Sequence, residues 1–162
     1  MSSIILRRRS DTGRIATLTS VLSCSVTEKL STEKTLSFET IIDSSMERVN
    51  DTDAYIAEFE EDYYDVTKVK KALSGGLYKI SIDCEHVSYR LSNSSNVINE
   101  ITATGNPREI MTVLLAGTEF HVGDIESNEP ATFSVTSETT RRAAILSFAA
   151  SMDLEAEFND YY

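Results

Sequence analysis

Tryptophan is absent from this 162-residue sequence, and proline, histidine and cysteine occur only twice each. A carbohydrate- or receptor-binding module is expected to expose tryptophan, so its absence argues against that class. No apolar run approaches the roughly 18 residues that a membrane span requires. The N-terminal segment MSSIILRRRS places its charges after its short apolar run. That order is the reverse of a secretory signal, so we expect synthesis in a cytoplasm.

Basic residues are also scarce relative to acidic ones. Lys and Arg number 15 against 26 Asp and Glu, which gives a net charge of −11 at pH 7. This balance argues against a nucleic-acid binder that works by neutralising phosphates. It remains compatible with a surface that nucleic acid slides past. A chain of this length can form one domain or two small ones.

The motifs of common enzyme classes are missing. The sequence contains no Gly-x-Ser-x-Gly, glycine-rich phosphate loop, His-Glu-x-x-His or Cys-x-x-Cys motif. His86 and His121 are the side chains that could act as bases near neutral pH, and a structural role is favoured for each. We therefore assign no catalytic and no cofactor-binding residue.

The cysteines, Cys24 and Cys84, both fall on the apolar face of a predicted strand. We predict two buried, reduced thiols, and a disulfide stays open if their strands are neighbours. A zinc site that includes His86 and His121 is disfavoured, because no ligand pair has the usual zinc spacing. No metal-binding residue is assigned.

Three charged or aromatic clusters have a plain and a functional interpretation. The clusters are the acidic residues Glu58, Glu60, Glu61 and Asp62, the pairs Tyr63-Tyr64 and Tyr161-Tyr162, and Arg7–Arg9. The acidic cluster lacks the spacing of a calcium loop, so a solvated strand end is favoured. The tyrosines are predicted to be exposed on strands, where they can pack on a neighbour. For the arginines a solvated strand end is favoured over a contact with an acidic neighbouring subunit.

The segment Leu77–Leu91 organises the first half of the chain. Tyr78, Ile80, Ile82 and Cys84 alternate with polar residues, as in a half-buried strand. The alternation then changes phase, which requires a bulge, a bend or the end of the strand. We predict that the strand ends near Glu85–His86 and closes a first domain.

The rest of the first 92 residues reads as further strands joined by short turns. The predicted strands are Ile4–Leu6, Arg14–Leu30, Lys34–Ile42 with Leu36 and Phe38 facing inward, Ala54–Glu60 and Tyr63–Leu73, with a polar connection over Asp43–Asp53. This order predicts an antiparallel β-barrel or sandwich over residues 1–92.

After Ser92 helical signals begin. Asn106-Pro107-Arg108-Glu109 has the pattern of a capped helix start, and Gly117 is a suitable stop. A second helix is predicted from Ser137 to about Met152, with short strands over Phe120–Ile125, Thr132–Val135 and Leu154–Phe158. We therefore predict an α+β protein in which a small α/β domain over 97–162 follows the barrel. The chain stops directly after a predicted strand, so we expect it to continue beyond Tyr162.

Several segments together resemble the N-terminal region of phage tail-tip proteins. They are LTSVLSCSVTEKL at Leu18–Leu30, TLSFE at Thr35–Glu39, CEHVSYRL at Cys84–Leu91, and the two helical segments Pro107–Gly117 and Glu138–Met152. The family comprises baseplate-hub or tail-associated lysin proteins, often called prophage tail endopeptidases. The sequence departs from the family between Ile42 and Ala54, where many members carry a longer glycine-containing segment.

The resemblance implies a structural component of the virion rather than an enzyme. It implies a homotrimeric hub at the tail tip that caps the tail tube and docks on a ring of distal tail protein. Tape measure protein and tail tube are implied neighbours, and DNA would pass through the channel without specific binding. Any lytic domain would lie downstream of Tyr162. The alternative readings are a cell-wall-degrading tail endopeptidase and a receptor- or glycan-binding tail module.

Overall fold

Strand β7 (Leu77–His86) ends where the alternation changes phase, as predicted. A 3₁₀ helix, η2 (Val87–Ser92), follows it directly. The computed structural model describes residues 3–29, 33–42, 49 and 54–158. These residues pack as two units, which we call the sheet unit (up to Val87) and the helical unit (Ser88–Phe158). Each unit is described by itself.

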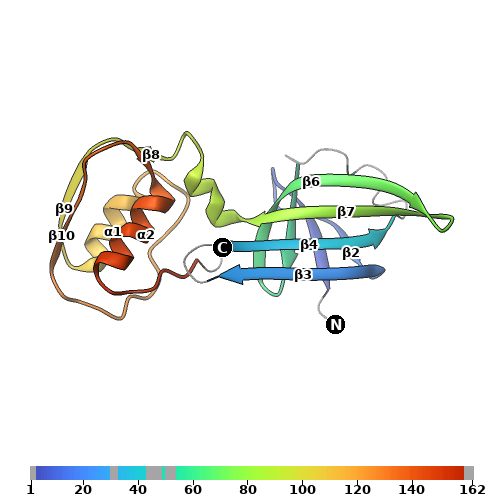
Figure 1. Cartoon of the computed structure of the whole chain (residues 1–162), viewed down its shortest axis with the longest axis horizontal. Helices are drawn as coiled ribbons and strands as arrows, with labels where there is room; N and C mark the ends of the chain where they lie inside the picture. The colour runs from blue at the N-terminus through green and yellow to red at the C-terminus, as the bar shows by residue number, and fades with distance from the viewer. Residues whose placement is uncertain (1–2, 30–32, 43–48, 50–53, 159–162) are drawn as a thin grey trace. The chain divides into compact units, whose positions relative to one another are not determined.

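The sheet unit is a curled, seven-stranded antiparallel sheet in the shape of a half-barrel (Figure 1). Its strands are β1 (Ile4–Arg8), β2 (Arg14–Leu18), β3 (Val21–Lys29), β4 (Glu33–Ile41), β5 (Tyr55–Phe59), β6 (Asp62–Ser74) and β7, in the spatial order β2-β1-β5-β6-β7-β4-β3. The α+β class is confirmed. Among the described residues β2 and β3 are the edge strands.

The prediction of one strand over Arg14–Leu30 is wrong. The chain breaks after Leu18, so β2 pairs with β1 while β3 pairs with β4. At the break the Ser20 carbonyl accepts hydrogen bonds from the Ile41 amide and the Thr40 hydroxyl. Ser, Thr and aliphatic residues occur on both sides of the break, so strand propensity could not reveal it.

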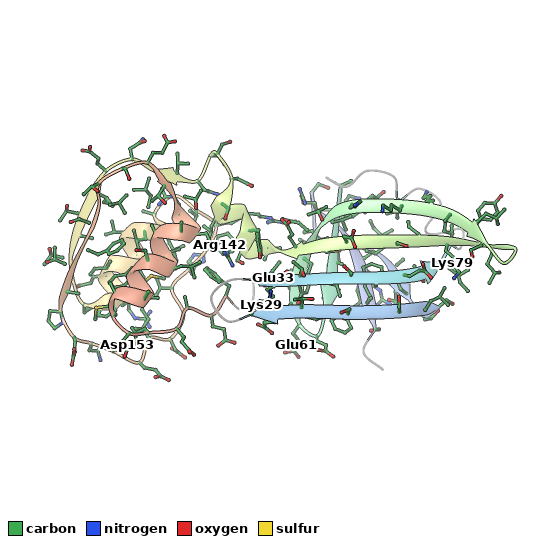
Figure 2. All side chains as sticks on the ribbon, viewed as in Figure 1. Lys29, Glu33, Glu61, Lys79, Arg142 and Asp153 are labelled. Carbon is green, nitrogen blue, oxygen red and sulfur yellow. The ribbon has the colours of Figure 1, made fainter. Side chains whose placement is uncertain are left out.

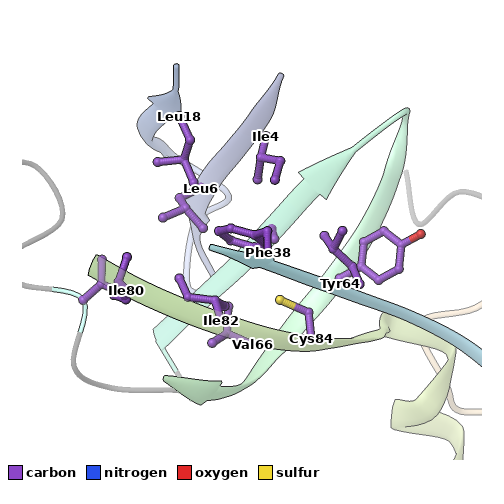
Figure 3. Packing of buried hydrophobic residues seen from close by; sticks show 12 residues of the cluster. Ile4, Leu6, Leu18, Phe38, Tyr64, Val66, Ile80, Ile82 and Cys84 are labelled. Atoms are coloured by element: carbon purple, nitrogen blue, oxygen red, sulfur yellow. The ribbon is translucent and has the colours of Figure 1, made fainter. Parts of the chain in front are cut away.

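One face of the sheet carries the core (Figure 3). The buried side chains include Ile4, Leu6, Leu36, Phe38, Tyr64, Val66, Ile80, Ile82 and Cys84. The inward orientation of Leu36 and Phe38 is confirmed. Tyr64 was predicted to be exposed, and that is wrong: it lies opposite Ala57 and His86 on the buried face. The predicted connection Asp43–Asp53 lies outside the described residues except for Val49, which is buried.

The turn between β5 and β6 has an unfavourable backbone. Glu60 and Glu61 adopt φ angles of 52° and 74°. Two successive positive φ angles are typical of a type I′ hairpin turn, for which Asn-Gly is the preferred pair. A non-glycine residue in this region costs roughly 1–2 kcal/mol.

We expect the double substitution Glu60→Asn with Glu61→Gly to raise the free energy of unfolding by about 1 kcal/mol, because it removes this strain. Urea unfolding followed by circular dichroism measures the change. Gly76→Ala is the matched control. Gly76 has a φ of 77°, so the alanine should destabilise. Destabilisation by the Asn-Gly pair would contradict the assigned turn geometry.

The helical unit places two helices against short strands (Figure 1). Its elements are β8 (Val97–Ile98), β9 (Ile101–Gly105), α1 (Pro107–Leu115), β10 (Ala131–Val135), β11 (Thr139–Thr140) and α2 (Arg141–Ser151). Strand β9 pairs with β10, and β8 pairs with β11. The capping box at Asn106 and Glu109 is confirmed. Neither described helix has the length and apolar character needed to cross a bilayer.

Two predicted strands of this unit are wrong, and three short strands, β8, β9 and β11, were missed. Phe120–Ile125 and Leu154–Phe158 are irregular segments. Apolar side chains from both segments, such as Phe120 and Phe158, pack against the core. Their spacing along the sequence therefore resembles the alternation of a strand, although no strand forms. The Arg108 guanidinium donates a 2.8 Å hydrogen bond to the Gly123 carbonyl and so helps to hold the first segment. The longest of the missed strands, β9, carries only the short Ala103 at its buried central position.

The predicted second helix starts later than Ser137. It begins at Arg141, and Thr140 is its N-cap. The preceding residues Thr139–Thr140 form strand β11 instead. Thr140 accepts a hydrogen bond from the Ala143 amide, which performs the capping role that the sequence had indicated for Ser137.

Candidate interaction surfaces

Carboxylates gather at the end of the sheet unit where β6 begins. Asp62 contacts the Lys34 ammonium at 2.8 Å and lies 3.6 Å from Nε2 of His86. Lys34 also lies 3.6 Å from Glu28 on β3. His86 is buried, and its ring stands edge-on to Tyr64 with centroids 5.6 Å apart. The other histidine, His121, lies exposed in an irregular segment of the helical unit.

This group of charges perturbs two titrating side chains. Burial pushes the pKa of Asp62 upward, but hydrogen bonds with His86 and Lys34 outweigh it and leave that pKa below its usual value. Burial raises the pKa of Tyr64, and the negative charges of Asp62, Glu28 and Glu60 raise it further. The negative charges of three carboxylates at this end therefore act on one buried ring.

The lowered pKa of Asp62 predicts a pH dependence of stability. A carboxyl with a depressed folded-state pKa stabilises the fold above its unfolded value of about 3.9, and that stabilisation is lost as pH falls through the lower folded value. We therefore expect Asp62→Asn to flatten the loss of stability below about pH 4. Thermal unfolding at a series of pH values measures this. Asp124→Asn, an exposed change in the helical unit, is the control. Identical acid limbs for the wild type and Asp62→Asn would contradict the prediction.

The cysteines do not both lie in the core. Cys84 is buried as predicted, but Cys24 is exposed and that prediction is wrong. Both thiols are free. Strand β4 separates their strands, because Cys24 lies opposite Phe38 and Cys84 lies opposite Leu36. Two strand spacings amount to about 9.6 Å, beyond the ~7 Å reach of a disulfide between Cα atoms.

The exposure of Cys24 reflects the position of β3 at the edge of the sheet. Leu22 and Val26 on the same strand are also exposed. The strand is nine residues long and pairs only with β4 among the described residues. An uncovered edge of this length offers unpaired backbone groups for pairing with another strand.

The three arginines at the end of β1 have partners within the sheet unit. Arg7 pairs with Glu58, Arg8 with Asp11 at 2.7 Å, and Arg9 with Asp65 at 2.8 Å. Of the predicted acidic cluster, Glu58 and Asp62 thus pair with cations of the same chain, while Glu60 and Glu61 form the exposed turn. No group of three or more His, Cys, Asp or Glu in the described part of the chain could hold a metal ion.

The sequence reasoning missed the exposed end of the β6–β7 hairpin. Leu73 and Tyr78 are each 63% exposed, and Leu77 is 48% exposed. The missed signal was a segment in which lysine is the only charged residue, within an otherwise acidic chain.

Structural comparison relates the whole described fold to phage tail proteins. No family model matches the sequence, and no curated protein sequence matches it. The prophage tail protein gp18 from Listeria monocytogenes EGD-e aligns over 91% of this chain and 45% of its own, with a TM-score of 0.67 and 12% identity. The tail protein from Neisseria meningitidis MC58 aligns over 99% of this chain and 48% of its own, with a TM-score of 0.70 and 12% identity. The chain therefore spans about half the length of these proteins and shares their fold.

Proposed function

We propose that this chain is a structural part of a phage tail and a component of the virion. The observation that carries the proposal is the fold shared with the Neisseria meningitidis tail protein over 99% of the chain at a TM-score of 0.70. The order of the sequence motifs, which resembles that of tail-tip proteins, supports the same assignment without reference to the structure.

Within the tail, the proposed place is the tip. The chain would belong to a homotrimeric baseplate hub that caps the tail tube, with the sheet unit docked as a barrel on the ring of distal tail protein. The exposed edge strand β3 and its apolar side chains support an assembling protein, because a monomer gains nothing from leaving them uncovered. Catalysis is not part of this role; a lytic domain would lie downstream.

The acidic character suits a channel wall for DNA. With a net charge of −11, a lumen lined by this chain would repel phosphates and let DNA pass without sticking. Reversing the charge of exposed acidic residues should then slow DNA ejection from assembled particles. An unchanged ejection rate would remove the channel from the proposal.

Co-purification tests the hub assignment. The purified chain is mixed with the distal tail protein encoded by the same phage, and native mass spectrometry gives the mass of the complex. The expected ratio is three copies of this chain to six of the ring protein. Lack of any complex would contradict the hub. Digestion of peptidoglycan by the purified chain would instead support the endopeptidase alternative, and binding on a glycan array would support the receptor-binding one.

A further inference from the structure

The β6–β7 hairpin concentrates positive charge in a negative protein. Residues 67–82, which we call the hairpin arm, contain four of the six lysines and no Asp or Glu. The arm therefore carries a charge of +4, and the remainder of the chain carries −15, since the total is −11. The four lysines are Lys68, Lys70, Lys71 and Lys79.

Within the part of the chain that the structure describes, the tip of the arm is a two-stranded ribbon. Among the described residues, β5 pairs with β6 as far as Asp65 and β4 pairs with β7 as far as Lys79, after which the Ile42 amide donates a 2.9 Å hydrogen bond to the Tyr78 carbonyl. Beyond those limits β6 and β7 pair with each other, with Leu73 opposite Tyr78 and Ser74 opposite Leu77. Tyr78 shares its face with Ile80 and Ile82 of the core, so the apolar stripe of the sheet runs on into an exposed region.

The arm presents its charge and its apolar side chains on opposite faces: Lys68 and Lys70 lie on one face, and Leu73 with Tyr78 lies on the other, so a partner would have to contact both faces. Lys68 and Lys70 lie opposite Asp83 and Ser81, and both are exposed. No ion pair of either lysine occurs among the described residues, whereas Lys79 pairs with Glu39 at 3.1 Å. A nucleic acid would use the lysines for phosphate contacts but would leave Leu73 and Leu77 uncovered. The combination favours a protein partner that is acidic and partly apolar.

The opposite end of the sheet unit has that complementary character. Glu60 and Glu61 are exposed in the β5–β6 turn, and Glu28 on β3 has 56% of its side chain exposed. Val26 lies on the same face as Glu28 two residues along the strand and is exposed. Figure 2 shows Lys79 at the hairpin end of the sheet unit, with Glu61 and the ion pair of Lys29 and Glu33 at the other end.

We infer that the hairpin arm of one copy docks on the acidic end of another copy. Strand β6 has 13 residues, which at about 3.3 Å per residue separates the two ends by roughly 40 Å. The arm therefore cannot reach the acidic end of its own chain. A contact between two different surfaces repeats head to tail, and it closes into a ring when the rotation between copies permits. The inference rests on the self-assembly proposed above and assigns the surfaces that carry it.

Charge reversal with complementary rescue tests the contact. Sedimentation equilibrium gives the association constant of the full chain for wild type, Lys68→Glu with Lys70→Glu, Glu60→Lys with Glu61→Lys, and all four changes together. Each double variant should weaken association at least tenfold, and the quadruple variant should recover most of it. Glu126→Lys with Glu129→Lys, an equal charge change on exposed residues of the helical unit, should leave the association constant within about twofold. Circular dichroism confirms that every variant is folded.

Two further readouts separate the alternatives. Leu73→Ser with Tyr78→Ser should also weaken association at least tenfold, because the apolar tip is part of the contact. Association that is insensitive to the lysine changes would overturn the inference while leaving self-assembly intact.

A wild type that is monomeric at all concentrations would overturn both the docking contact and the proposed self-assembly. Loss of DNA binding in the lysine variants, with unchanged mass, would identify nucleic acid as the occupant and overturn the inference. Failure of the quadruple variant to recover would exclude the acidic end as the acceptor.

Discussion

Replacing Phe38 with alanine is expected to lower the free energy of unfolding of the sheet unit by about 3–5 kcal/mol. Phe38 is buried in the middle of β4, between Cys24 on β3 and Ile82 on β7. Truncation removes the buried ring and leaves a cavity that a sheet held on both sides cannot close. Urea unfolding monitored by circular dichroism, or hydrogen exchange of amides in β4 and β7, measures the loss.

The control for this prediction is Leu73→Ala. Leu73 is an apolar residue of the same unit but lies on the exposed hairpin tip, so its truncation should change stability by less than about 0.5 kcal/mol. The pair also separates folding from assembly, because the Leu73 side chain is assigned to the docking contact. A loss of equal size for the two variants would contradict the assigned core.

Replacing Arg142 with alanine is expected to destabilise the helical unit by about 2–4 kcal/mol. Arg142 is only 9% exposed, and its guanidinium carbon lies 4.5 Å from the centre of the Tyr89 ring and 5.2 Å from that of Phe158. The substitution removes two cation–π contacts and the packing of the aliphatic stem. Arg142→Lys should recover part of the loss, because it keeps a cation but not the planar group.

Thermal unfolding of these variants gives the comparison, and Arg108→Ala is the matched control. Arg108 is exposed and donates to backbone carbonyls of the loop at Val122 and Gly123, so its removal should cost no more than about 1 kcal/mol. If Arg142→Ala were as mild as the control, the two ring contacts would not contribute to stability.

The sequence predicts features that depend on neighbours along the chain. The end of β7 at His86 follows from the change in alternation, and the cap of α1 follows from four consecutive residues. The inward orientation of Leu36 and Phe38 also follows from alternation, because β4 is a central strand and its apolar face is covered.

The errors concern features that depend on neighbours across the sheet. Cys24 and Val26 have the same alternation as Leu36 and Phe38, yet they are exposed because β3 is an edge strand. The sequence of β3 alone does not indicate that this strand will lie at the edge of the sheet. Tyr64 illustrates the converse: it was predicted to be exposed, but the register with His86 places it inside.

The candidate surfaces were predicted only in part. The acidic residues around the β5–β6 turn stood out as a cluster, but the pairing of Glu58 with Arg7 and of Asp62 with Lys34 depends on strand order. The hairpin arm did not stand out from the sequence, because Lys68, Lys70, Lys71 and Lys79 form no motif along the chain. Its significance comes from the end of pairing with β4 and β5, which only the three-dimensional register reveals.

The position of Arg142 has a consequence for how the polypeptide is organised. Tyr89 stands near the first residue of the helical unit and Phe158 is its last described residue, and both rings contact the same guanidinium. The first and last described parts of this unit therefore lie close to each other. A segment whose two ends lie close together can be inserted into another polypeptide, or deleted from it, without changing the distance between the residues on either side. A short peptide could therefore join the positions of Tyr89 and Phe158 directly.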